Sequence, residues 1–103
     1  MSIPVEQVAR TFAACTPLFF ALGERPRQQI LLLLTENETL NVGQFAERLP
    51  LSRPAISHHL KILRQAGLVD LQQAGTENRY FLTVDAAIEL LEKFVVEVKA
   101  CGT

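Results

Sequence analysis

The sequence predicts a mainly α-helical domain of the α+β class, with one small β-hairpin. Apolar residues recur three and four positions apart over most of the chain, which is typical of helices that pack on a core. Proline and capping residues divide these stretches into separate helices, and one glycine-centred segment separates two short runs of strand-forming residues. The expected order is helix, helix, short strand, helix, helix, strand, strand, helix.

Length and composition fit one domain over residues 1–103. Of these residues 49% are hydrophobic and 20% are charged, a composition that excludes an intrinsically disordered chain. A chain of this length is close to the size at which a second subunit adds stability, so we expect an oligomer. Apolar runs such as residues 30–34 are far shorter than the roughly 20 residues that span a bilayer, and no signal sequence is evident. We therefore expect a cytoplasmic protein that does not associate with membranes.

The first two helices are predicted on either side of a proline. Residues 5–15 carry an apolar stripe at helical spacing, made of Val5, Val8, Phe12 and Cys15. Pro17 lacks a backbone donor and is predicted to kink or end this helix. The second helix is expected to begin near Pro26, which the first helical turn tolerates, and to contain residues 30–34. Because these five apolar residues surround the helix, we expect it to form the core.

Capping residues mark the next two helices. Asn41 and Gln44 have the spacing of a capping box that opens a short helix, and Leu49-Pro50 ends it. Ser52 can cap the following helix, which is predicted to end at Gly67. Two helices joined by a tight turn in this way form a helix-turn-helix pattern.

A hairpin and a last helix complete the chain. Residues 68–72 and 79–83 are predicted strands, joined by a loop over residues 74–78. A hairpin in this position forms a wing beside the helix-turn-helix. The last helix is expected from about residue 84 to residue 101, with a stripe made of Ala87, Leu91, Phe94, Val98 and Cys101.

Two adjacent histidines, His58 and His59, fall inside the fourth predicted helix. Successive side chains on a helix differ by about 100°, so the two imidazoles cannot share a face. Taken with its neighbours, His58 lies on a polar arc of about 140° and His59 lies in the middle of the apolar arc. We expect His59 to be a core residue whose ring nitrogens bond to backbone or to a neighbour. A shared metal site is not expected, since helical ligands favour a spacing of four and the chain has no third histidine.

The polar arc of this helix suits a contact with DNA. Short hydroxyl donors, an imidazole and cations lie one or two turns apart, as in a helix that reads base edges in the major groove. Residues 51–83 carry four basic and two acidic side chains, a charge of +2, whereas the rest of the chain carries six basic and nine acidic ones, a charge of −3. This polarity favours a polyanionic partner for one face, although an ordinary solvated helix surface would show the same residue types.

These residues also resemble a known family. The segment LSRPAISHHLKILRQAGLV at 51–69, the hairpin residues Gly75, Tyr80 and Leu82, and ALGERPRQQILLLL at 21–34 are similar to the ArsR/SmtB family of winged helix-turn-helix repressors. The resemblance covers roughly residues 20–83. It implies a homodimeric transcriptional regulator that binds palindromic double-stranded operator DNA and leaves it on an effector signal.

The resemblance assigns roles to parts of this chain. It implies that residues 53–66 form a recognition helix in the major groove and that residues 68–83 form the wing. It also implies that the helices within 1–22 and 84–101 form the dimer interface, which their apolar stripes suggest independently because one small core cannot use both. The expected DNA-binding residues are Ser52, Arg53, Pro54, Ser57, His58, Lys61, Gly75 and Arg79.

The sequence departs from the family pattern at several positions. The usual Asp/Pro/Thr/Arg opening of the second helix is here residues 24–27, Glu-Arg-Pro-Arg, and the wing tip has Thr76 and Glu77 where basic residues are common. The cysteine pair of some metal-sensing members is missing from NVGQFAERL at 41–49. The second known metal set is also missing, because Asp85 is followed by two alanines and no histidine lies beyond His59. We therefore expect no metal and no cofactor, and the effector is unknown.

Two alternatives remain open for the cysteines and for the function. Cys15 and Cys101, on the two supposed interface helices, are either a thiol switch or soft-ligand site or simply small buried apolar residues. An enzyme is not expected, since Ser57 and His58 diverge on the helix and no glycine-rich phosphate loop occurs. The alternative function is a winged-helix module that binds another protein without operator binding, and the salt dependence of DNA affinity distinguishes the two.

Overall fold

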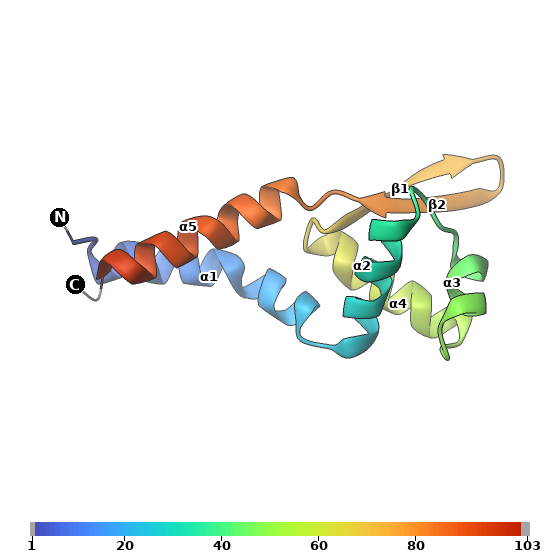
Figure 1. The fold of residues 1–103 in the computed structure, drawn as a ribbon, viewed down its shortest axis with the longest axis horizontal. Coiled ribbons are helices and arrows are strands. Elements are labelled where there is room, and N and C mark those ends of the chain that lie inside the picture. The colour runs from blue at the N-terminus through green and yellow to red at the C-terminus, as the bar shows by residue number, and fades with distance from the viewer. Residues whose placement is uncertain (1, 102–103) are drawn as a thin grey trace.

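The computed structural model describes residues 2–101 as an elongated molecule with two parts (Figure 1). Its extents are 53 × 24 × 20 Å. One part is an arm in which the first and last helices lie side by side and run in opposite directions, and the other part holds the remaining elements. The elements are α1 (Val5–Leu22), α2 (Arg25–Glu36), α3 (Val42–Arg48), α4 (Arg53–Gln65), β1 (Val69–Ala74), β2 (Glu77–Leu82) and α5 (Asp85–Cys101).

The predicted fold class and element order are confirmed, with the short strand reduced to a single bridge. Leu40 forms this bridge with Tyr80, through N···O distances of 3.1 and 2.9 Å. The bridge connects the segment before α3 to β2 and so fixes the hairpin against the helix-turn-helix. Within residues 2–101, no helix is long and apolar enough to cross a bilayer.

Of the kink or end predicted at Pro17, the end does not occur, because helix α1 continues to Leu22. An interior proline costs about 3 kcal/mol because it removes a hydrogen bond and crowds the preceding turn. The turn after Pro17 buries Leu18, which is 3% exposed, and Ala21, which is fully buried. Burial of one leucine contributes about 1.5–3 kcal/mol, so packing of this last turn offsets the proline.

The hydrophobic core lies where α4 meets the other helices and the hairpin. Ile56, Leu60 and Leu63 of α4 are fully buried, together with Ile30 of α2 and Phe45 of α3. The apolar run of α2 is less uniformly buried than we expected. Leu32 is 63% exposed, because only one face of α2 contacts the core.

Local signals fix the ends of the helix-turn-helix. The Asn41 side chain accepts a hydrogen bond from Gln44 N at 2.8 Å and Gln44 Oε1 accepts one from Asn41 N at 2.9 Å, which confirms the capping box. The Ser52 hydroxyl accepts a hydrogen bond from Ala55 N at 3.3 Å and so caps α4. Gly67 follows α4 with φ of +77°, a conformation that glycine adopts without steric cost.

The hairpin is longer at its tip than the sequence predicted. Ala74 pairs directly with Glu77, so Gly75 and Thr76 form a two-residue turn in place of a five-residue loop. Gly75 has φ of +66° at the first turn position, as a type II′ hairpin turn requires. The two strands of the wing are therefore paired along their whole length, up to the turn.

Candidate nucleic-acid interface

Helix α4 presents its polar arc to solvent. The six residues that the sequence assigned to DNA at this helix are all exposed, namely Ser52, Arg53, Pro54, Ser57, His58 and Lys61. Their apolar counterparts, such as Ile56 and Leu60, are fully buried on the opposite side. The helix is thus held by one face and leaves the other available to a ligand.

The two histidines face different surroundings, as predicted. His58 is exposed, His59 is half-buried, and their ring centroids lie 5.6 Å apart. His59 Nδ1 lies 3.1 Å from a terminal nitrogen of Arg27. Partial burial, reinforced by the Arg27 charge, holds the pKa of His59 below its ordinary value, although the Glu24 carboxylate acts in the opposite direction.

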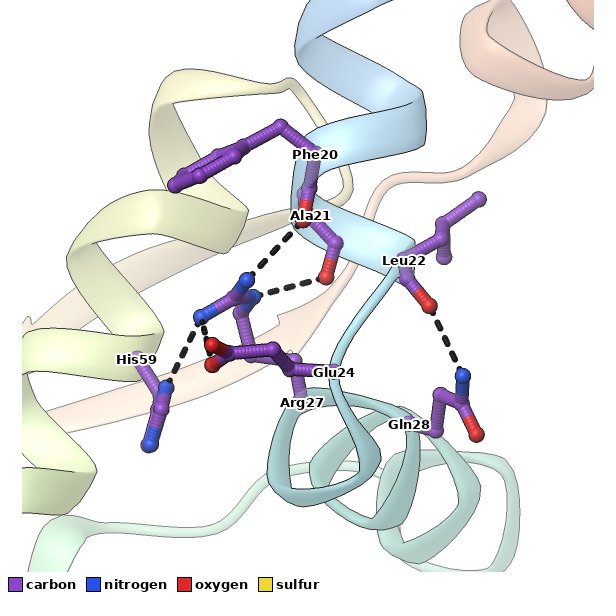
Figure 2. Close-up of polar contacts among 7 residues, drawn as sticks. All are labelled: Phe20, Ala21, Leu22, Glu24, Arg27, Gln28 and His59. Atoms are coloured by element: carbon purple, nitrogen blue, oxygen red, sulfur yellow. Dashed lines mark hydrogen bonds and ion pairs between the residues drawn. The ribbon is translucent and has the colours of Figure 1, made fainter.

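The partner of His59 was missed by sequence reasoning. Arg27 is only 2% exposed and lies between the C-terminal end of α1 and the middle of α4 (Figure 2). Arginine is seldom buried this completely. An arginine in the first turn of a predicted helix is therefore normally interpreted as a surface residue. The family-like opening of α2 contained this residue, but no periodicity or motif assigned a contact to it.

The basic side chains of α4 differ in whether another residue already binds them. Among the described residues 2–101, Lys61 forms no ion pair. Arg64 donates to Asp70 at 3.0 Å, and the Arg53 guanidinium lies over Gly43 of α3, where an added Cβ would come within 3.3 Å of it. A recess of about 420 Å³ lies between α4 and the hairpin, and its lining includes Lys61, Arg64 and Tyr80.

The wing holds its own arginine in an ion pair. Arg79 donates from Nε to Glu77 Oε2 at 3.0 Å, and the Asn41 side-chain amide donates to the other oxygen of Glu77. The hydrogen bonds from Arg79 and Asn41 hold the pKa of Glu77 below its ordinary value. Gly75 is exposed at the tip. The structure therefore brings the two expected wing residues to the surface, with Arg79 already paired.

The arm formed by α1 and α5 exposes many apolar side chains. Phe12 contacts Phe19 and Phe94 edge-on, with ring centroids 5.8 and 4.9 Å away, yet Phe12 is itself 52% exposed. The other exposed large apolar residues of these two helices are Val5, Phe19, Phe20, Ile88, Val95, Val96 and Val98. A surface of this kind is larger than one arm needs for its own packing.

A buried carboxylate, which no sequence pattern predicted, also lies inside the arm. Glu97 of α5 is 3% exposed and accepts hydrogen bonds from Thr11 and from Gln7 Nε2, the latter at 3.2 Å. These bonds, above all the one from Thr11, hold its pKa below the ordinary value against the effect of burial. Gln7 and Thr11 of α1 thus form a polar contact with α5 through Glu97, beside the apolar stripe.

The two cysteines are free and lie apart within one chain. Cys15 is buried with its Sγ 3.9 Å from the Leu90 carbonyl oxygen, and burial, with the nearby Glu97 charge, raises its pKa. Cys101 is half-buried and follows Leu90 by eleven residues on α5, about 16 Å along the helix. Within residues 2–101, no cluster of three or more histidine, cysteine or acidic side chains is placed to hold a metal ion.

Sequence comparisons place the chain among transcriptional regulators. A profile described as bacterial regulatory protein, arsR family, matches residues 26–70. An uncharacterized HTH-type transcriptional regulator of Methanocaldococcus jannaschii is 39% identical over 75 residues, which span 73% of this chain and 84% of that protein. The transcriptional activator HlyU of Vibrio cholerae is 37% identical over 92 residues, which span 86% of this chain and 84% of HlyU.

Solved structures agree with the sequence comparisons. An ArsR-like transcriptional regulator from Rhodococcus sp. RHA1 superposes with a TM-score of 0.76 at 32% identity, over 88% of this chain and 85% of that one. Reduced HlyU from Vibrio cholerae superposes with a TM-score of 0.71 at 36% identity, over 85% of this chain and 95% of HlyU. The chain therefore belongs to the ArsR family of winged helix-turn-helix transcriptional regulators.

Proposed function

We propose that this protein is a homodimeric, cytoplasmic repressor that binds specific operator sequences in double-stranded DNA. Helix α4 enters the major groove and the hairpin formed by β1 and β2 contacts the backbone as a wing. The observation that carries this proposal is the outer face of α4, where every polar residue assigned to DNA is exposed and Lys61 has no ion-pair partner among residues 2–101. Of the two relatives reported above, one is named as a transcriptional regulator and the other, HlyU, as a transcriptional activator.

The dimer contact is assigned to the arm. The exposed phenylalanines and valines of α1 and α5 need cover, and a second copy of the chain offers an identical apolar surface. A two-fold dimer places two copies of α4 on successive major grooves, about 34 Å apart, and so predicts a palindromic operator.

Duplex selection followed by a salt titration tests this function. We expect the purified chain to enrich a palindromic sequence and its affinity to fall with salt at a log-log slope of about −0.9 for each phosphate contacted. Lys61→Ala should weaken binding and reduce the magnitude of the log-log salt slope by about one, the value for one lost phosphate contact. Lys93→Ala removes the same charge from an exposed site of α5 that lies about 160° around the helix from Val95, and it serves as the matched control, with no change expected.

Three outcomes would contradict parts of the proposal. A shallow salt slope together with tight binding of a protein would favour the interaction module over an operator-binding protein. Equal losses for Lys61→Ala and Lys93→Ala would contradict the assignment of α4 to the DNA contact. Activation of a reporter fused to the selected sequence would contradict repression. Activation is the role in the name of HlyU.

A thiol-reactive or soft-metal signal is our candidate effector. Cys15 and Cys101 lie on the two helices assigned to the subunit contact, so chemistry there would act on the dimer. Their separation of about 16 Å along α5 exceeds the reach of a disulfide, so a bridge within one chain is excluded and the partner subunit must contribute. In a gel shift, diamide, which accepts the two hydrogens of a thiol pair, should release wild-type protein from DNA and leave Cys15→Ser and Cys101→Ser bound. If diamide does not change the gel shift of wild-type protein, the thiol signal is refuted and the cysteines serve only in packing.

A further inference from the structure

The buried guanidinium of Arg27 joins three helices through four hydrogen bonds. Its Nε donates to the Ala21 carbonyl at 2.7 Å, and one terminal nitrogen donates to the Phe20 carbonyl at 2.9 Å. The other terminal nitrogen donates to Glu24 Oε2 at 2.9 Å and lies 3.1 Å from His59 Nδ1. Figure 2 shows the side chain extending from α2 into the space between α1 and α4.

On the α1 side, Arg27 caps the end of the arm. Phe20 and Ala21 lie in the last turn of α1, where the helix dipole favours a positive charge, and the Phe20 carbonyl also accepts a hydrogen bond from Gly23 N at 3.3 Å. The guanidinium carbon also lies 5.1 Å from the centre of the Phe20 ring. The direction in which α1 leaves the globular part is therefore set partly by this one side chain.

On the α4 side, the contact fixes the state of a histidine. A guanidinium has donors only, so His59 Nδ1 must be the acceptor and the ring must be neutral with its proton on Nε2. His59 precedes the buried Leu60 and follows His58, which is exposed on the groove face. The contact with Arg27 is therefore made in the same turn of α4 as a residue assigned to DNA.

We propose that Arg27 is a positioning residue for DNA binding, which holds α4 at a fixed angle to α1 and so links the subunit contact to the DNA contact. The inference rests on the proposed function. It adds a residue that lies inside the protein and touches neither DNA nor the partner subunit. The connection is rigid because a planar guanidinium with three kinds of acceptor has only one compatible arrangement.

The connection also depends on the proton of His59. The titratable groups that face this ring are Arg27 and Glu24 from α2 and His58 from α4, whereas the last turn of α1 contributes only carbonyl groups and the Phe20 ring. A protonated His59 loses the acceptor and places a second cation against Arg27. Acidification below the ordinary histidine range should therefore loosen α4.

Variants of His59 test the proposal without removing the buried charge, since Arg27→Ala is expected to unfold the chain. His59→Ala should bind the selected duplex about ten-fold more weakly than wild type, a loss that corresponds to one charge-assisted hydrogen bond. His59→Asn keeps an acceptor at the position of Nδ1 and should restore affinity to within about two-fold. Ile30→Val weakens the core of α2 beside Arg27, and it should bind as wild type wherever urea titration shows it to be folded.

A pH series and a double variant supply readouts that packing alone would not change. The ratio of wild-type to His59→Asn affinity should fall between pH 7.5 and 5.5, because both proteins retain the exposed His58 and only wild type loses an acceptor. Arg27→Lys should weaken binding, and adding His59→Ala to it should cost little more. In ¹⁵N spectra, His59 of the free protein should be the Nε2–H tautomer.

The outcomes separate this inference from the function on which it rests. Absence of wild-type binding to any duplex would refute the proposed function and the inference together. Wild-type binding with an unaffected His59→Ala variant, an equal loss for Ile30→Val, or a ratio that does not change with pH would refute the role of Arg27 alone.

Discussion

The side-chain amide of Asn41, at the start of α3, donates a hydrogen bond to the Glu77 carboxylate on the first residue of β2. Asn41 is also the cap of α3, so one residue serves both the helix end and the wing. Glu77 in turn holds Arg79 by an ion pair of 3.0 Å. The acidic residue at the wing tip thus ties the hairpin to the helix-turn-helix and pairs with Arg79, the cation that we assign to the DNA backbone.

Neutralising Glu77 should strengthen DNA binding. In Glu77→Gln the Arg79 side chain, which is 54% exposed, loses its ionic partner and becomes available to the backbone. We expect tighter binding in low salt and a log-log salt slope that steepens by about 0.9, the value for one added phosphate. Glu47→Gln removes an equal charge from the same recess between α3 and the wing and should leave the slope unchanged. Weaker binding by Glu77→Gln would show that fixing the wing matters more than freeing the arginine.

The two histidines should differ in how much alanine substitution lowers the free energy of unfolding. His58→Ala should weaken operator binding while its free energy of unfolding stays within about 0.5 kcal/mol of wild type, as for other exposed sites. His59→Ala should lower that free energy by about 1–3 kcal/mol, because a buried arginine loses an acceptor. Urea titrations of both variants measure this difference. Equal shifts would contradict the opposite orientation of the two rings.

Stability should fall when the pH drops below the histidine range. The pKa of His59 is lower in the folded protein than its ordinary value of 6.5, so the unfolded chain binds a proton that the folded chain does not. The contribution of His59 is complete above pH 6.5 and is lost as the pH falls towards the lowered pKa. Urea midpoints should therefore decrease between pH 7.5 and 5.5 in wild type and change less in His59→Asn. A flat wild-type profile would contradict the lowered pKa.

Removing the Thr11 hydroxyl should make the arm sensitive to acid. The pKa of Glu97 lies below its ordinary value of 4.5, so its contribution to stability is present above that pH and disappears as the pH falls through the lowered pKa. Thr11→Val deletes the main hydrogen bond, so the pKa of Glu97 rises and acid unfolding should begin at higher pH. Circular dichroism along an acid titration measures the midpoint. The exposed Thr16→Val, on the same helix, is the control and should leave it in place.

The two thiols should differ in reactivity. Alkylation requires the thiolate, and Cys15 is buried with a raised pKa whereas Cys101 is half-buried. We expect iodoacetamide at pH 7.5 to label Cys101 at least about ten-fold faster than Cys15. Mass spectrometry of the timed reaction identifies the labelled peptide, and both sites should react alike in denaturant. Faster labelling of Cys15 would mean that α1 and α5 separate readily.

Local rules were sufficient for the elements that position the interface. Asn41 with Gln44 and Ser52 marked the starts of α3 and α4, and the helical period separated His58 from His59. These features depend on neighbours within one or two turns, which the sequence displays directly. The helix end that the same rules allowed at Pro17 does not occur, because tertiary packing of the following turn outweighs a local penalty.

The contacts that the sequence could not predict are those between distant residues. Arg27 and His59 lie 32 positions apart, and Thr11 and Glu97 lie 86 apart. Each joins a charged residue to a polar one inside an apolar surface, and no periodicity distinguishes such a residue from its solvated neighbours. The wing tip was mispredicted for a related reason, since direct pairing of Ala74 with Glu77 depends on the twist of the whole hairpin.

The antiparallel course of α1 and α5 brings the start of α1 and the end of α5 to one tip of the arm, opposite the wing (Figure 1). A fluorophore, affinity handle or fused domain attached beside either of these helix ends therefore starts far from α4 and leaves the residues that we assign to the major groove unobstructed. The same attachment begins beside the apolar flank of the arm. Labels intended to report on DNA should be small, and bulky ones become instead a probe of whether two copies meet along that flank.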